Sequence, residues 1–101
     1  MAKIKSKVLS FAASASPDVV GYKMYVSPQG QDLDYDSDVV NLGNVTSVDL
    51  GTVPALMSKD GIFDIGITAV DDGGNESDMS IIGDVPLDFV PPTPPGAISL
   101  T

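Results

Sequence analysis

The sequence contains no cysteine, histidine, arginine or tryptophan among its 101 residues. Without cysteine it forms no disulfide framework and offers no thiolate nucleophile. Without histidine it has no imidazole base, and it lacks the usual protein ligands of zinc and haem. It also has no nucleophile elbow, phosphate-binding loop or HExxH motif. We therefore predict that the protein is not an enzyme, with no catalytic residue and no bound cofactor.

Positive charge is scarce, because 5 lysines face 14 aspartates and glutamates, which gives a formal net charge of −9. A chain of this sign repels phosphates, so the sequence argues against a nucleic-acid partner. The balance is uneven: residues 1–23 carry +3 and residues 24–101 carry −12. We expect Lys3, Lys5 and Lys7 to form a basic edge on an acidic body, where they are candidates for contact with a protein partner.

Long apolar runs are also missing. No stretch approaches the roughly 18 apolar residues of a membrane span, so we expect no membrane partner. A secretory signal needs roughly 7–15 apolar residues after a basic start. The segment after Lys7, residues 8–14, is short and interrupted by serines. This pattern predicts a chain that folds in the cytosol, is exported by a route that does not read its N-terminus, or is a fragment of something larger.

Strand signals dominate, and no window of 11 or more residues keeps a helical period. Alternating apolar residues and turn residues predict six or seven strands, with a turn at Gly43 and Asn44, a tight loop at 71–75 and one short helical turn in 54–59. The strands are expected at residues 4–12, 21–26, 39–42, 45–53, 63–70 and 79–90, the last bent or broken at Pro86. Short strands at this spacing predict an all-β fold, an antiparallel β-sandwich.

The end of the chain has a different composition. Residues 90–96 hold four of the eight prolines, and residues 97–101 then alternate like a strand. A proline-rich spacer is stiff, and 12 residues reach on the order of 37 Å at roughly 3.1 Å each. That exceeds the roughly 13 Å radius of gyration of a 100-residue domain. We therefore divide the chain into a β-sandwich at 1–89 and an extended tail at 90–101.

Three stretches resemble a fibronectin type III domain, a member of the immunoglobulin-like sandwiches, of the bacterial or phage type. Residues 8–25 resemble that family's second and third strands. Residues 63–77, with the sequence FDIGITAVDDGGNES, are similar to its sixth strand and the following hairpin. Residues 91–101 look like the linker and first strand that open such a domain. The resemblance covers nearly the whole chain and implies a fibronectin type III-like antiparallel sandwich.

The order of these stretches departs from the family pattern. A first-strand sequence stands at the C-terminal end, and only residues 1–7 precede the second strand. In the family the two chain ends lie at opposite poles, so the tail points away from its own vacant position. We expect the tail to add a strand to a neighbouring molecule. Two alternatives remain. The tail is either a linker from a truncated tandem array or a disordered tail, or it docks on its own domain. The candidate contact residues in the tail are Pro91, Pro92, Pro94, Pro95, Ile98 and Leu100.

These features predict a structural or interaction module whose partners are proteins. The leading hypothesis is a decoration or accessory protein of a bacteriophage virion, assembled in the host cytoplasm as a homo-oligomer or on capsid or tail proteins. The alternative is an extracellular carbohydrate- or cell-surface-binding module from a secreted bacterial enzyme or adhesin. Tyr35 and Phe89 are the aromatic residues that the predicted core does not account for, so either is a candidate contact anchor.

Two acidic runs raise the question of calcium, which prefers several oxygen ligands on one loop. In the first run every second residue is an aspartate, so its side chains would share one strand face and form a solvated acidic edge instead. The second run lies on the loop that the family resemblance already explains. The candidate ligands are Asp32, Asp34, Asp36 and Asp38 in the first run and Asp71, Asp72, Asn75, Glu76 and Asp78 in the second.

Overall fold

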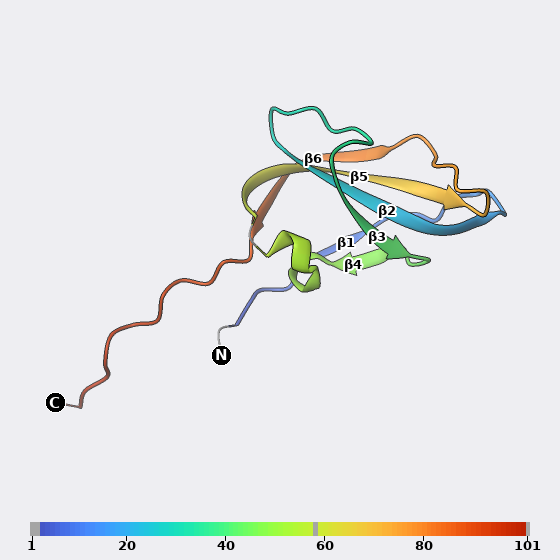
Figure 1. The fold of residues 1–101 in the computed structure, drawn as a ribbon. Coiled ribbons are helices and arrows are strands. Elements are labelled where there is room, and N and C mark those ends of the chain that lie inside the picture. The colour runs from blue at the N-terminus through green and yellow to red at the C-terminus, as the bar shows by residue number, and fades with distance from the viewer. Residues whose placement is uncertain (1–2, 58, 101) are drawn as a thin grey trace.

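The computed structural model describes residues 3–57 and 59–100 and shows two antiparallel β-sheets facing each other (Figure 1). The smaller sheet pairs β1 (Val8–Ser10) with β4 (Ser47–Asp49). The larger sheet has the strand order β3-β2-β5-β6. Its strands are β2 (Val19–Pro28), β3 (Asp38–Gly43), β5 (Asp60–Asp71) and β6 (Ser80–Asp88). The predicted all-β class, with antiparallel sheets in a sandwich-like arrangement, is confirmed.

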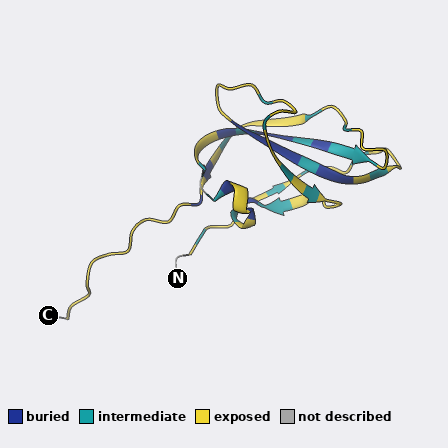
Figure 2. Ribbon diagram, viewed as in Figure 1, coloured by how far each residue is buried: buried dark blue, intermediate teal, exposed yellow. Residues whose placement is uncertain are grey.

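The core lies between the two sheets. Alternate residues of β2 and β5 point inward, as the period of a strand requires. Two 3-10 turns, η1 (Leu50–Thr52) and η2 (Pro54–Leu56), add apolar side chains from the connection between β4 and β5. Figure 2 shows the buried residues concentrated on β2 and β5 and at these turns. The core residues are Met24, Val26, Leu50, Val53, Leu56, Phe63, Ile65, Leu87 and Phe89. Phe89 is therefore part of the core, and its predicted role as an exposed anchor is wrong.

Two strands are shorter than predicted. Residues 4–7 and 11–12 lie outside β1, residues 45–46 lie outside β4, and residues 50–52 form η1 instead of continuing β4. The cause is the carboxylate of Asp49, which accepts hydrogen bonds from the backbone N–H of Gly51 at 3.0 Å and of Lys7 at 3.2 Å. These bonds replace the strand ladder with a turn at the end of β4. The single helical turn expected in residues 54–59 is present as η2.

The turn at Gly43 and Asn44 joins strands of different sheets, because β3 pairs with β2 and β4 pairs with β1. It is therefore not the hairpin turn that the spacing suggested. In β6 the irregularity also lies elsewhere than predicted. The ladder shifts register between Phe63 and Ile65 of β5, opposite the segment that holds Asp84, whose φ is 57°. Pro86 remains paired with Ile62, because proline is tolerated in an edge strand.

The tail leaves the sandwich at the pole where β1 begins (Figure 1). Residues 91–100 contain no strand, and every one of them is exposed. The molecule measures 66 × 27 × 18 Å with a radius of gyration of 16.9 Å. A compact domain of this length has a radius of gyration of about 13 Å. The described tail residues account for this elongated shape.

Candidate functional site

One edge of β1 carries backbone groups without a strand beside them. Phe11 donates its N–H to the carbonyl of Thr46 at 2.9 Å, and the carbonyl of Lys7 accepts from Leu50 at 2.8 Å. In an antiparallel ladder, successive residues direct their N–H and C=O to opposite sides. Val8 and Ser10 therefore direct theirs away from β4. Within the described ranges, no strand pairs with β1 on that side.

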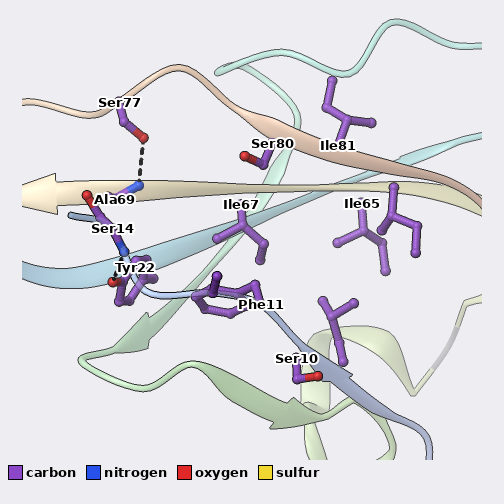
Figure 3. A pocket seen from close by; sticks show the side chains of 13 residues that line it. Ser10, Phe11, Ser14, Tyr22, Ile65, Ile67, Ala69, Ser77, Ser80 and Ile81 are labelled. Carbon is purple, nitrogen blue, oxygen red and sulfur yellow. Dashed lines mark hydrogen bonds between the residues drawn. The ribbon is translucent and has the colours of Figure 1, made fainter.

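A groove of about 440 Å³ runs between this edge and the larger sheet. Figure 3 shows Ile65 and Ile67 pointing from β5 across the opening toward Phe11, while Ile81 points to the other side of the sheet. The lining carries no charged side chain, and its polar groups are the hydroxyls of four serines and one tyrosine. The lining residues are Leu9, Ser10, Phe11, Ala12, Ser14, Tyr22, Ile65, Ile67, Ala69, Ser77, Ser80, Ile81 and Ile82.

The inner face of the larger sheet is incompletely covered at this groove. Ile82 of β6 lies opposite Ile65 of β5, and opposed residues on neighbouring strands share a face. Ile65 has 0% of its surface exposed, whereas Ile82 has 50% exposed. The sheet of β1 and β4 covers the first residue and stops short of the second. A further strand beside β1 would cover Ile82.

Contacts at both ends hold the groove in shape. At one end the ammonium of Lys7 donates to the carbonyl of Pro86, which links β6 to the residue before β1. At the other end the ring of Phe11 lies edge-on to Tyr22, with centroids 4.9 Å apart. The Tyr22 hydroxyl accepts a hydrogen bond from the N–H of Ser14 at 2.9 Å. Fixed walls of this kind reduce the reorganisation that a bound strand requires.

Residues 3–7 do not fill the groove. Ile4 packs against the core, and the Ser6 hydroxyl donates to the carboxylate of Asp49 at 2.9 Å. This hydrogen bond, together with those from the backbone of Lys7 and Gly51, holds the pKa of Asp49 below its ordinary value. The segment therefore continues beyond the start of β1, alongside η1. Lys3 and Lys5 are exposed, and Lys7 makes the contact with Pro86 described above.

The tail residues predicted to contact a partner lie in solvent. Ile98 is 98% exposed and Leu100 is 102% exposed relative to an extended reference. The structure does not bring them to the groove or to the three N-terminal lysines. All six candidate residues of the tail are exposed: Pro91, Pro92, Pro94, Pro95, Ile98 and Leu100.

The first acidic run does not assemble a cation site. Among residues 3–57 and 59–100, no three acidic side chains converge as metal ligands. Asp34 accepts hydrogen bonds from the backbone of Asp36 at 2.9 Å, and Asp38 pairs with Lys59 at 3.0 Å. Asp32 is exposed nearby, and its backbone carbonyl accepts from Ser27. The carboxylates of Asp34 and Asp38 are therefore each engaged with a separate donor.

The second acidic run is also engaged in local structure. Asp71 accepts hydrogen bonds from the side chain of Asn75 at 3.1 Å and from the backbone of Asn75 at 2.8 Å and Gly73 at 3.0 Å. These bonds, led by that from the Asn75 side chain, lower the pKa of Asp71. Glu76 turns away to the larger sheet, where Thr68 donates to it at 2.8 Å. Asp72 and Asp78 are exposed. Hydrogen-bond donors within the loop therefore engage the Asp71 carboxylate and hold the loop in its turn conformation.

The sequence predicts the tail and a vacant strand position beside the strand of residues 4–12, but not the apolar residues that line the groove. A signal was present in Ile81 and Ile82, since adjacent isoleucines in a strand point to opposite faces and an edge strand needs only one apolar face. The other candidate anchor, Tyr35, is 51% exposed, but its hydroxyl donates to the carbonyl of Ser77 at 2.8 Å and its ring packs on Tyr25. It is therefore held by the sheet that it covers.

Comparison with known proteins gives no relative: no family model, no curated protein and no solved structure matches the chain. In the part of the chain that the structure describes, none of the helices has the length and hydropathy needed to cross a bilayer.

Proposed function

We propose that the chain is a non-enzymatic structural module, a fibronectin type III-like sandwich that assembles with other proteins through its C-terminal tail. The observation that supports this most directly is the open edge of β1 beside the half-exposed Ile82. Unpaired strand edges bind added strands through main-chain hydrogen bonds, and apolar side chains entering a groove add specificity. An extended tail with a strand-like sequence is suited to this kind of binding.

We propose that the chain assembles on a bacteriophage virion, where it is a decoration or accessory protein. Domains of the fibronectin type III kind occur on virions, and the sequence resembles that family over nearly its whole length. A net charge of −9 keeps such a protein soluble until it meets its binding site. The acidic loops between β2 and β3 and between β5 and β6 would face solvent.

The first experiment tests assembly through the tail. The full chain and a form lacking residues 90–101 are incubated with purified virions of the phage that encodes the chain, or with its capsid and tail proteins, and sedimented. The full chain is expected to sediment with the particle and the shortened form to stay in the supernatant. Because residues 91–100 are all exposed in the single chain, the shortened form should remain folded, which thermal melting verifies. Equal sedimentation of the two forms would contradict assembly through the tail.

The second experiment separates the virion from the alternative of a carbohydrate- or cell-surface-binding module. Mass spectrometry of purified virions should detect the chain in stoichiometric amounts. Neighbouring genes for capsid and tail proteins are expected, rather than genes for glycosidases or adhesin repeats. Retention of the shortened form on a polysaccharide column, together with absence of the chain from virions, would favour the alternative.

A further inference from the structure

The lining of the groove beside β1 defines the chemistry of a ligand that would fit it. Its lining is uncharged and mostly apolar, and its open strand edge offers main-chain donors and acceptors. A fitting ligand is therefore an extended segment without charge and with apolar side chains at alternate positions. Residues 90–101 contain no aspartate, glutamate, lysine or arginine. Ile98 and Leu100 stand two residues apart, so in a strand they share one face.

The tail of the same molecule does not reach this groove in the antiparallel direction. Phe89 is held in the core beyond the end of β6, and the far end of the groove lies at Ser80, nine residues earlier. Nine residues of strand span about 30 Å. The eight steps from Phe89 to Ala97 reach about 25 Å in a proline-rich conformation, with nothing left for the reversal of direction. The tail of a second molecule is limited neither by this reach nor by the need to reverse its direction.

We propose that residues 97–100 of one copy bind in the groove of a second copy, antiparallel to its β1. This inference rests on the proposed function and names the partner and the site. In the register where Ser99 lies opposite Ser10, Ile98 faces inward beside Phe11 and Leu100 beside Leu9. The N–H and C=O groups of Ser10 then pair with those of Ser99.

This register buries two exposed groups of apolar side chains: Ile82 in the groove, and Ile98 and Leu100 in the tail. The incoming Ile98 and Leu100 cover the inner face at Ile82, and the groove in turn buries two side chains that are fully exposed in the single molecule. The contact brings no charge into the groove, so it adds no repulsion between two bodies that each carry −9. Because the tail leaves the pole where β1 begins, each copy extends toward the next in one direction (Figure 1).

The test uses two full-length variants that each lack one half of the contact. The tail variant is Ile98→Asp/Leu100→Asp, and the groove variant is Ile82→Asp. A charge placed against the apolar lining opposes burial of the strand. Each variant alone is expected to be a 10.4 kDa monomer in size-exclusion chromatography with light scattering, whereas the unaltered chain forms larger species. An equimolar mixture should give a heterodimer of about 21 kDa, because one intact tail meets one intact groove.

Matched controls carry the same charges on the opposite faces. Ala97→Asp/Ser99→Asp alters the other face of the tail strand. Ile62→Asp alters the outer face of β5 at a residue that is 42% exposed, similar to Ile82. Both controls should associate within about threefold of the unaltered chain, while the test variants weaken association at least about tenfold. Thermal melting verifies that each variant is folded.

Ser10→Pro provides a groove variant that does not depend on side-chain charge. It removes an N–H that points to the open edge, whereas the bonds between β1 and β4 come from the residues on either side. The register is tested by mixing a Ser10→Cys chain with a Ser99→Cys chain under oxidation, since the chain has no other cysteine. A cross-linked dimer is expected, and a Ser6→Cys chain should give much less.

The outcomes separate this inference from the proposed function. A monomeric unaltered chain at all concentrations overturns the inference, and sedimentation with virions then still decides the proposed function. Loss of association in the tail variant but not in either folded groove variant shows that the tail binds a different surface. That result overturns the inference alone. Undiminished association of the tail variant overturns the inference, because the copies then associate through a surface other than the tail. Sedimentation of the tail variant with virions still decides the proposed function.

Discussion

The hydroxyl of Tyr25 donates a hydrogen bond to the carboxylate of Glu76, which lies 51 residues later in the chain. Thr68 donates to the same oxygen at 2.8 Å, and the ammonium of Lys23 lies 3.6 Å from the other. Burial, followed by the contact with Glu76, raises the pKa of Tyr25 to about 12. These contacts fasten the segment after β5 to the outer face of the larger sheet.

This cluster predicts a loss of stability in acid. The hydrogen bond from Tyr25, followed by those from Thr68 and Lys23, lowers the pKa of Glu76. A carboxyl with a lower pKa in the folded state stabilises the fold above its unfolded pKa of about 4.3, and this contribution is lost as pH falls below that value. Thermal melting between pH 6 and pH 3 should therefore show a falling midpoint.

The variant Tyr25→Phe removes the leading cause of that shift. We expect the pKa of Glu76, followed by NMR titration of its side-chain carboxyl, to rise in this variant. The acid loss of stability should then be smaller, because the folded and unfolded pKa values lie closer together. The variant Glu76→Gln should have a smaller acid dependence than the unaltered chain. An unchanged Glu76 titration in Tyr25→Phe would show that the hydrogen bond does not set the pKa.

Truncation to alanine is expected to lower the free energy of unfolding by different amounts at Ile65 and at Ile82. Ile65→Ala opens a cavity in a closed core and is expected to lower the free energy of unfolding by about 2–5 kcal/mol. Ile82→Ala removes atoms that are already half exposed and should cost less than half as much. Urea unfolding on the Ile98→Asp/Leu100→Asp background measures both without association. Equal costs would mean that Ile82 is buried in the isolated chain.

A side chain at position 66 is expected to clash with its neighbours on the outer face of the larger sheet. A Cβ atom built at this position would lie 2.2 Å from Sδ of Met79 and 3.2 Å from Cδ2 of Leu33. Gly66→Ala should therefore destabilise the fold by about 1–3 kcal/mol, the usual range for overpacking. Adding Met79→Ala should recover part of the loss, and a double-mutant cycle measures this coupling. Additive effects of the two substitutions would contradict the contact.

Calcium binding provides a further test. Because Asp34, Asp38 and Asp71 are each engaged with local donors, we expect millimolar CaCl₂ to leave the thermal midpoint unchanged at constant ionic strength. MgCl₂ at the same concentration is the control for charge screening. A rise in the midpoint with calcium alone would reveal a site, since a ligand that binds only the folded state must stabilise it.

Much of the fold was predictable from local patterns. The alternation of Phe63 and Ile65 with polar residues defined β5, and Pro54 marked the short turn of η2. The ends of β1 and β4 were not predictable, because they depend on hydrogen bonds between Asp49 and the distant Lys7. The fibronectin type III resemblance and the virion remain predictions.

The candidate site was only half predictable, for a related reason. The tail is visible in the sequence because proline content and alternation are local properties of residues 90–101. The groove depends on the exposure of Ile82, which is set by how far the sheet of β1 and β4 extends over β6. The local sequence pattern does not indicate how far the smaller sheet extends over β6. The register between Ser10 and Ser99 likewise follows only from the direction of the ladder around Val8.

The direction in which the tail leaves the sandwich gives any chain of copies two chemically different ends. The terminal copy at one end keeps an empty groove beside Val8 and Ser10, and the copy at the other end keeps an unbound Ile98 and Leu100. Growth could therefore be started or stopped selectively. A single short peptide carrying the sequence of residues 90–101 would cap the first end and limit the length of the polymer.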